Sequence, residues 1–356
     1  MTGFFTYRNF SLHDTPPLDG RVALITASAG NRIVAHSRDS EITAQLLRYG
    51  IEKVFVVARN KNKYMDSKEE WRRRAHITLG KNDSRVEFIK CDLTDILSVQ
   101  GAARQVKLKT ERLHIVICNA GQAVSSQYHR SPQNVESVFA ANCLGHHILV
   151  ILLLSLLRET VRTTSSEARV VVASSSMHQL CRKLDLDLLT LPTNPKPALY
   201  DGIWRYGRSK LGDILFTKEL SRRLLQAGDT SSKRIYVNAF FPGNIVTEQW
   251  NAWNAFLGKL IGSMLRKVFS VIGQSVQDGA ATAVYLAASK EVKERDIRGQ
   301  YFVPIAKPKT ASAIANDMEL ARDLWNWIDA KATETLGSNW QHETDEDRLD
   351  KSPRAM

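Results

Sequence analysis

Short apolar runs rich in β-branched residues recur along most of this chain, with longer amphipathic stretches between them. Six of the runs read VALIT (22–26), VFVVA (54–58), VEFI (86–89), LHIVIC (113–118), RVVVAS (169–174) and IYVNAFF (235–241). They lack the alternation of a strand with one face in water, so we expect parallel strands buried on both faces. The repeated β-α order predicts an α/β fold: a single doubly wound, parallel β-sheet with helices on both faces.

The stretches between the runs divide the chain further. Helical patterns fall at 40–49, 62–78, 95–110, 132–160, 204–227 and 275–289, and a last strand is expected within 299–304. We expect an N-terminal extension over residues 1–18, one α/β domain over 19–305, a C-terminal helix within 306–336 and a disordered, polar tail over 337–356.

The N-terminus, the longest apolar run and the cysteines all indicate a cytoplasmic protein. Residues 1–20 lack a basic segment followed by an apolar one, so we predict no signal peptide. The run ILVILLLSLL (148–157) is about half the length that spans a bilayer, and it predicts a buried helix. The four cysteines show no metal-ligand spacing, so we expect buried, reduced thiols and no metal site.

The net charge of +12 is compatible with a nucleic-acid partner or an anionic membrane. The densest basic cluster, WRRR (71–74), lies in a helical pattern directly after two glutamates. No zinc-finger, helix-turn-helix or RNA-binding signature accompanies it. We therefore interpret the cluster as a solvated helix face and predict no nucleic-acid partner.

The stretch RYGRSKLGDILFTKEL (205–220) holds the residues with the clearest chemistry. Tyr206 and Lys210 are four residues apart, so on a helix their side chains share one face. There an ammonium group can stabilise the charged form of a tyrosine, which can then exchange a proton with an alcohol or carbonyl oxygen. Taken alone, this spacing arises by chance in many helices.

Further polar or small residues follow the predicted strands, where open α/β sheets bind ligands. RVVVAS (169–174) leads into further serines, CNAG (118–121) ends a strand with small turn residues, and FFPGNIVTE (240–248) adds a Pro-Gly turn and a threonine. Asn142 lies inside a mostly apolar helix, where an asparagine needs a polar partner.

With these motifs in this order, residues 19–305 resemble the short-chain dehydrogenase/reductase family, which are NAD(P)-dependent oxidoreductases with a Rossmann-type fold. Within the family, the chain is most similar to the retinol-dehydrogenase-like and WW-domain-oxidoreductase-like branch, including its fungal relatives. The resemblance implies hydride transfer between the cofactor and an alcohol, ketone or aldehyde.

The resemblance also implies a role for each matching residue. Tyr206 matches the catalytic acid/base. Lys210 matches the residue that stabilises the charged form of this tyrosine and holds the nicotinamide ribose. Ser175 matches the serine that binds the reacting oxygen, favoured over Ser174 and Ser176 by the Met-His that follows. Asn142 matches the helix asparagine that is associated with a proton-relay water.

The cofactor-binding matches are Thr26, Gly30, Asp92 beside the adenine, Asn119, Ala120 and Gly121 in the NAG turn, Lys210, and Pro242, Gly243 and Thr247 near the nicotinamide amide. Asp92 could alternatively cap the following helix. His146 and His147 follow Asn142, and we expect them in the core or at an interface rather than on a metal.

Arg59 closes the second predicted strand, in VFVVARN (54–60). An acidic residue there would accept hydrogen bonds from the ribose 2′-OH and favour NAD(H). An arginine can instead pair with a 2′-phosphate. We therefore predict NADP(H) in preference to NAD(H). Separately, we predict a small hydrophobic substrate.

The apolar segment 250–273 contains interspersed basic residues and has two interpretations. In relatives, the region after the Pro-Gly turn forms a mobile flap over the substrate, which here would line a site for a lipid-like molecule. Alternatively, the segment lies on a membrane or lipid-droplet surface with its basic residues among the headgroups. A homodimer is also left open as an alternative to a monomer.

One segment, LITASAGNRIVAHSRDSEITAQLL (24–47), departs from the family pattern. Thr26 and Glu41 match the two ends of the glycine-rich cofactor turn, but residues 27–40 form a longer stretch than the family has, and only Gly30 matches a glycine. Those glycines allow a tight turn and a close approach of the backbone to the pyrophosphate.

Three explanations fit this departure. The turn is rebuilt, with Arg32 or Arg38 supplying positive charge. Cofactor binding is weakened or lost, which would leave a catalytically silent interaction protein on the same scaffold. Or a misassigned splice boundary has placed foreign residues between two matching motifs. The intact catalytic set favours the third explanation.

Overall fold

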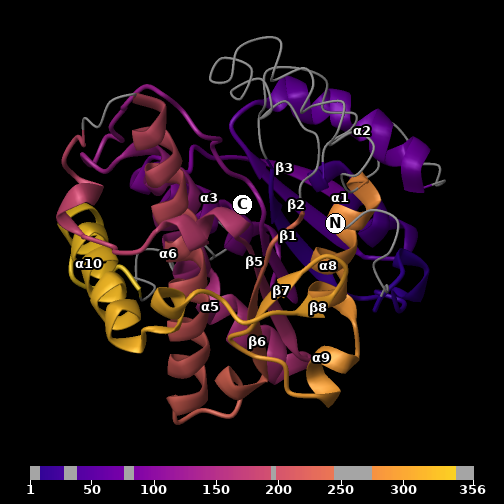
Figure 1. Ribbon diagram of the computed structural model, residues 1–356. Coiled ribbons are helices and arrows are strands. Elements are labelled where there is room, and N and C mark those ends of the chain that lie inside the picture. The colour runs from indigo at the N-terminus through magenta and orange to yellow at the C-terminus, as the bar shows by residue number, and fades with distance from the viewer. Residues whose placement is uncertain (1–8, 28–37, 76–83, 194–197, 244–274, 342–356) are drawn as a thin grey trace, which may run out of the picture.

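The structure is a computed structural model that describes residues 9–27, 38–75, 84–193, 198–243 and 275–341. Within them, eight strands form one sheet in the order β3-β2-β1-β4-β5-β6-β7-β8 (Figure 1). The first seven run parallel, and β8 pairs with β7 antiparallel. The strands are β1 (Val22–Thr26), β2 (Lys53–Ala58), β3 (Val86–Lys90), β4 (Ile115–Cys118), β5 (Ala168–Ala173), β6 (Ile235–Phe240), β7 (Tyr301–Val303) and β8 (Lys307–Pro308). The predicted doubly wound sheet is confirmed.

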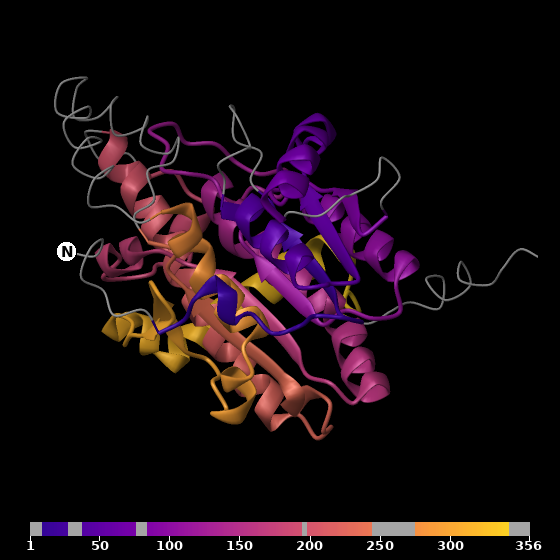
Figure 2. The same cartoon turned by 90° about the vertical axis from the view of Figure 1, so that its right-hand side faces the viewer.

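Helices cover both faces of this sheet (Figures 1 and 2). One face carries α3 (Ile96–Lys109), α5 (Gly145–Thr164) and α6 (Ala198–Gln226), with α10 (Met318–Leu336) packed against α6 and α3. The other face carries α1 (Arg38–Arg48), α2 (Lys61–Ala75) and α8 (Val276–Ala288). The short helix α4 (Ser137–Phe139) leads into α5, and α9 (Glu291–Glu294) lies in the connection between α8 and β7.

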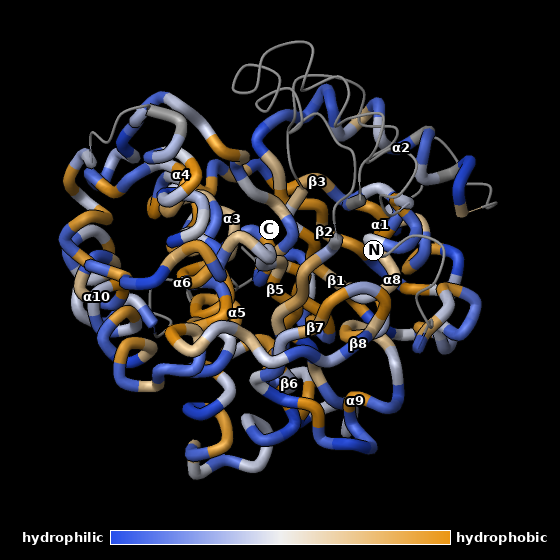
Figure 3. Tube along the Cα trace, in the orientation of Figure 1, coloured by the Kyte–Doolittle hydropathy of each residue, from blue (hydrophilic) through white to orange (hydrophobic). Residues whose placement is uncertain are grey.

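The strands bury side chains on both faces, which explains why their sequences do not alternate. In β5 every residue is buried: Val170 and Val172 belong to the apolar core under α5 and α6. Val171 and Ala173 belong to the core under α1 and α8. Figure 3 shows hydrophobic residues along the strands in the interior and hydrophilic residues on the outer sides of the helices.

The helix predicted over 132–160 begins later, at Ser137, and contains an irregular turn. Glu136 caps its start, because the Glu136 carboxylate accepts hydrogen bonds from two backbone N–H groups of α4. Ala140–Leu144 then form a π-helical turn before α5 continues to Thr164. Such a turn inside a helix is frequent at functional sites.

Both described terminal segments pack on the sheet domain. Phe10 is buried, and its ring centre lies 5.5 Å from that of Tyr285 in α8. The Trp340 indole is also buried and donates a 3.0 Å hydrogen bond to the Asp329 carboxylate on α10. The disorder predicted from residue 337 therefore does not hold for residues 337–341, because Trp340 fills an apolar site.

The WRRR cluster is only partly the solvated face that the sequence predicts. Arg73 is exposed, but Trp71 is buried. Arg74 forms ion pairs with Glu70 and with Glu41 of α1. The cluster therefore joins α2 to the beginning of α1 instead of pointing entirely into solvent.

The buried helix predicted at 148–157 is confirmed. It lies within Ser137–Thr164, a described segment long and apolar enough to cross a membrane, and 94% of the most apolar window of that segment is buried inside the protein. A core helix passes the same test of length and composition. All four cysteines are free and buried, as predicted.

His147 of α5 lies in an aromatic cluster. Its ring centre is 4.5 Å from that of Phe216 and 4.4 Å from that of Trp325. Neither ring nitrogen has a hydrogen-bond partner among the described residues. Burial lowers the pKa of His147 from 6.5 to about 3, so the ring is neutral at pH 7.

We predict that His147→Phe makes the fold less sensitive to acid. Between pH 6.5 and 3, the unfolded chain binds a proton at His147 that the folded protein does not, so stability is lost as the pH falls. The loss is about 1.4 kcal/mol per pH unit. Urea denaturation at pH 7.5 and 5.0 should show a smaller loss of stability for the variant than for wild type. Equal losses would contradict a buried, neutral ring.

Candidate active site

The carboxyl ends of four neighbouring strands bring the predicted site residues to one edge of the sheet. Thr26 closes β1, Asn119–Gly121 follow β4, Ser174–Ser175 follow β5, and Pro242–Gly243 follow β6. Because these strands are parallel and adjacent, the four groups lie at the same edge. Gly243 has a φ of +94°, which side chains rarely adopt, so the turn after β6 requires glycine there.

Tyr206 and Lys210 lie on one face of α6, as their spacing predicts. The Lys210 Nζ is 5.8 Å from the centre of the Tyr206 ring. This buried ammonium group donates hydrogen bonds to the Ala173 carbonyl (2.7 Å) and to the Asp213 carboxylate (2.9 Å). The bond to Ala173 ties α6 to the end of β5, and it fixes a positive charge beside the tyrosine.

Asp213 is a site residue that the sequence interpretation missed. Its carboxyl group is buried three residues after Lys210, and burial raises its pKa to about 7, against the opposing effect of the Lys210 charge. The spacing is visible in the sequence. An acid three residues from a lysine is, however, usually an exposed pair on a helix surface, so the pattern alone does not reveal a buried counterion.

The two serines that follow β5 have different partners. The Ser174 hydroxyl donates to the Lys210 backbone carbonyl (2.7 Å), so Ser174 holds α6 in place. The Ser175 hydroxyl accepts from the Met177 N–H (3.2 Å) and keeps its own proton for another acceptor. Of the two, Ser175 is therefore the serine that can still donate to a substrate oxygen, in agreement with the sequence preference.

His178 holds the Ser175 backbone. Its Nδ1–H donates to the Ser175 carbonyl (2.6 Å), and its Nε2 accepts from the Ser312 N–H (3.3 Å). Burial lowers the pKa of His178, which favours this neutral form. The sequence interpretation gave His178 no role, and no local pattern could have revealed a partner so distant in the chain.

Asn142 lies fully buried in the π-helical turn Ala140–Leu144. Its side chain holds the turn after β4: Oδ1 accepts from the Gln122 N–H (2.7 Å), and Nδ2 donates to the Gln122 carbonyl (3.2 Å). Nδ2 also donates to the Ser209 hydroxyl (3.0 Å). The carboxamide thereby joins the turn after β4 to α6, one residue before Lys210.

A pocket lies at the ends of β2 and β4, where the sequence predicts the adenosine end of a dinucleotide. Its walls include Ala58, Arg59, Asp92, Ala120 and Gly121. The side chains of Arg59 and Asp92 are 52% and 43% exposed and lie 4.0 Å apart, so both can reach a ligand. The small residues of the NAG turn leave room beside them.

Asp92 does not cap α3, the alternative that the sequence left open. The cap is Asp95, whose carboxylate accepts from the Leu97 N–H. The Asp92 carboxylate instead accepts from the N–H and the hydroxyl of Thr94 (3.0 and 2.8 Å). This local turn fixes the Asp92 carboxylate in the wall of the pocket.

Some predicted site residues lie outside the described residues. They include Gly30 of the cofactor turn, Thr247 and the segment 250–273. The described part of the cofactor turn is its beginning, at Thr26 and Ala27, and its end, where α1 begins.

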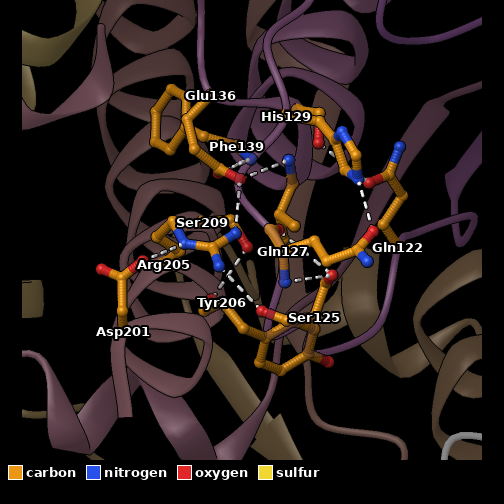
Figure 4. A network of polar contacts seen from close by, with 12 residues as sticks. Gln122, Ser125, Gln127, His129, Glu136, Phe139, Asp201, Arg205, Tyr206 and Ser209 are labelled. Carbon is orange, nitrogen blue, oxygen red and sulfur yellow. Dashed lines mark hydrogen bonds and ion pairs between the residues drawn. The ribbon is translucent and has the colours of Figure 1, made fainter. Parts of the chain in front are cut away.

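A buried ionic network lies beside the YxxxK motif (Figure 4). The Arg205 guanidinium donates to the carboxylates of Asp201 (2.8 Å) and Glu136 (3.0 Å) and to the Ser125 carbonyl (2.7 Å). A Cβ added at Gly202 would clash with the Ser125 oxygen, so glycine permits this close approach. The network joins α6, the cap of α4 and the loop after β4, and it fixes that loop as a wall of the site.

Comparison with known proteins agrees with this geometry. The family model described as short chain dehydrogenase matches residues 40–181. A short-chain dehydrogenase/reductase of Aspergillus calidoustus is 36% identical over 249 residues, which cover 68% of this chain and 76% of that protein. The WW domain-containing oxidoreductase of Gallus gallus is 32% identical over 330 residues, 90% of this chain and 70% of the relative. A solved uncharacterized protein of Mycobacterium paratuberculosis has a TM-score of 0.65 and 22% identity, covering 93% of this chain and 98% of its own.

The sheet and the residues at its edge define an oxidoreductase with a dinucleotide-binding fold. The chain belongs to the short-chain dehydrogenase/reductase family, as its motifs predict. Proteins of this family use NAD(P)(H). One of these relatives is a fungal protein and the other is a WW domain-containing oxidoreductase, so the comparisons also support the predicted branch of the family. The family match begins at residue 40, so it includes no part of the altered turn before α1.

We predict that Arg205→Met strongly destabilises the fold. Without the guanidinium, the buried carboxylates of Glu136 and Asp201 lose their cation, which costs about 3–5 kcal/mol in urea denaturation. The control is Arg162→Met, which removes an exposed ion pair with Glu159 on α5 and should leave stability within experimental error. Similar losses in both variants would contradict the importance of the buried network.

Proposed function

We propose that this protein is an NADP(H)-dependent oxidoreductase that interconverts a hydrophobic alcohol and its ketone or aldehyde. The observation that carries this proposal is the arrangement on α6: Tyr206 and the buried cation of Lys210 share one face, and the bond from Ser174 to Lys210 ties this helix to the strand end that carries Ser175. When bound, the dinucleotide supplies or accepts the hydride. The protein supplies the proton and orients the reacting oxygen of the substrate.

Each side chain has a defined step in this proposal. In reduction, the Tyr206 hydroxyl donates a proton to the carbonyl oxygen, and in oxidation its phenolate accepts the proton of the alcohol. The Ser175 hydroxyl donates a hydrogen bond that orients this oxygen. Lys210, held by the Ala173 carbonyl and Asp213, places a positive charge beside the tyrosine ring.

Arg59 supports NADP(H) as the cofactor. Its half-exposed guanidinium lies at the end of β2, in the wall of the adenosine pocket. Its 4.0 Å pair with Asp92 is a weak surface interaction, so the guanidinium is available for a 2′-phosphate. The residues that end β2, Ala58 and Arg59, include no carboxylate that could accept from a ribose 2′-OH.

A hydrophobic substrate and a cytoplasmic location belong to the same proposal. The apolar segment 250–273 follows the Pro242–Gly243 turn in the sequence, and its apolar composition supports an apolar substrate. Contact of this segment with a membrane or lipid droplet is the other interpretation. Four free, buried cysteines support a reducing compartment.

One observation favours a second candidate function, a catalytically silent interaction protein on the same scaffold. Helix α1 carries Asp39 in its first turn, in addition to Glu41, which matches the family pattern and pairs with Arg74. Carboxylates near a helix N-terminus repel a phosphate from the place where this fold binds it. If residues 27–40 do not compensate, the dinucleotide does not bind and the site has no hydride source.

For Tyr206→Phe we expect no measurable NADPH-dependent reduction of a panel of hydrophobic ketones and aldehydes. The affinity for NADPH should stay within about three-fold, since only the proton donor is removed. Tyr49→Phe is the control, because Tyr49 bonds to the His13 carbonyl at the far end of α1. It should retain wild-type turnover. Wild-type turnover in Tyr206→Phe would exclude this tyrosine as the acid/base.

For Arg59→Glu we expect NADPH affinity to fall by at least about ten-fold, because the 2′-phosphate loses a charge-assisted pair and meets a like charge. The affinity for NADH should stay equal or increase. Fluorescence titration of both nucleotides measures the ratio. Arg162→Glu makes the same charge change at an exposed position of α5 and should leave the ratio unchanged. An equal loss in both variants would indicate a general charge effect.

A further inference from the structure

His146 lies between the cofactor edge of the site and the asparagine of the π-helical turn. It is 1% exposed on α5, four residues after Asn142. Its Nε2 is 2.8 Å from the Thr26 hydroxyl, and its Nδ1 is 2.7 Å from the backbone carbonyl oxygen of Asn142. Both ring nitrogens are therefore engaged, unlike those of the adjacent His147.

The chemistry of the partners fixes the direction of each hydrogen bond. The Asn142 carbonyl can only accept, so the His146 Nδ1 carries the proton. The Thr26 oxygen already accepts from the N–H groups of Asn119 and Ala120 (2.9 Å each), so its own proton points to Nε2. Burial lowers the pKa of His146 to about 4, which keeps the ring neutral. The Nδ1–H tautomer satisfies both partners at once.

The hydrogen bonds continue from Asn142 to the catalytic helix. The Asn142 Nδ2 donates to the Ser209 hydroxyl (3.0 Å), and this hydroxyl donates to the Tyr206 backbone carbonyl (2.8 Å). These hydrogen bonds therefore run from the NAG turn through Thr26 and His146 to the main chain of Asn142, and the Asn142 side chain continues them to α6. In the low dielectric of the interior, removing one member leaves its neighbours unsatisfied, which is costly.

We infer that His146 is a positioning residue, which in its Nδ1–H form sets the spacing between the strand ends that receive the dinucleotide and the helix that carries Tyr206. This inference rests on the proposed function. Asn142 lies in an irregular π-helical turn, where the main chain alone holds it less firmly than a regular helix would. A displacement of about 1 Å at a reacting group can lower a rate by about 100-fold, so bracing this turn matters for catalysis.

The first test detects the tautomer in the protein without cofactor. In long-range ¹H–¹⁵N spectra of histidine-labelled protein, we expect His146 to be a neutral Nδ1–H ring from pH 8 to 5.5, assigned by its absence in His146→Gln. Thr26→Val, which removes the hydroxyl but keeps the shape, should shift the Nε2 resonance. An Nε2–H tautomer, or a charged ring at pH 7, would overturn the inference whatever the activity.

The second test interrupts the chain at two places, with His146→Leu and Ser209→Ala. We expect each to lower kcat by at least about ten-fold while the KM for NADPH stays within about three-fold. The kcat of the double variant should be little lower than that of either single variant, because each substitution alone already interrupts the network. His146→Gln, which retains a donor and an acceptor, should recover most of the kcat.

His147→Phe is the matched control, since it changes the neighbouring buried histidine outside the chain, and it should keep the wild-type kcat. Should His146→Leu fail to fold, Thr26→Val takes its place in the cycle. Wild-type kcat in the single variants, or fully multiplicative losses in the double variant, would overturn the inference. If the wild-type protein itself shows no turnover, the proposed function fails and the tautomer alone decides the inference.

Discussion

The buried ammonium group of Lys210 must be satisfied by the protein, because an unpaired charge in the interior is very costly. Its hydrogen bonds go to the Ala173 carbonyl at the end of β5 and to Asp213 on its own helix. A third bond, from Ser174 to the Lys210 carbonyl, joins the same two elements. These contacts set the register of α6 against the sheet. The register in turn sets where Tyr206 lies relative to the end of β5, so the candidate active site depends on how one buried cation is held.

Around this pair, an apolar scaffold contains closed polar networks. A sheet buried on both faces leaves little water for polar groups, so each must find a partner in the protein. The His146 chain and the Arg205 network both meet this requirement, and both end on the segment of α6 that holds Tyr206. His147 represents the opposite case: its neutral ring packs against the rings of Phe216 and Trp325 and makes no hydrogen bond among the described residues.

The sequence predicts the sheet, most helices and the strand-end residues because these signals are local. Tyr206 and Lys210 are one helical turn apart, and the NAG and Pro-Gly turns directly follow their strands. Asp213, His178 and Arg205 escape such reasoning, because burial and distant partners define their roles. The partner of His178 is 134 residues away, and Arg205 and Glu136 are 69 residues apart. The late start of α4 follows from the Glu136 cap, which the apolar periodicity does not show.

We propose that this scaffold holds a working dinucleotide site although residues 27–40 depart from the family pattern. The described side of the site supports it, since Thr26 fixes the NAG turn and Arg59 lines the adenosine pocket. Titration of the purified, full-length protein with NADPH, followed by energy transfer from its tryptophans, tests the claim most directly. We predict saturable binding with a dissociation constant on the order of 1–100 μM and weaker binding of NADH. No binding up to millimolar NADPH would contradict the account.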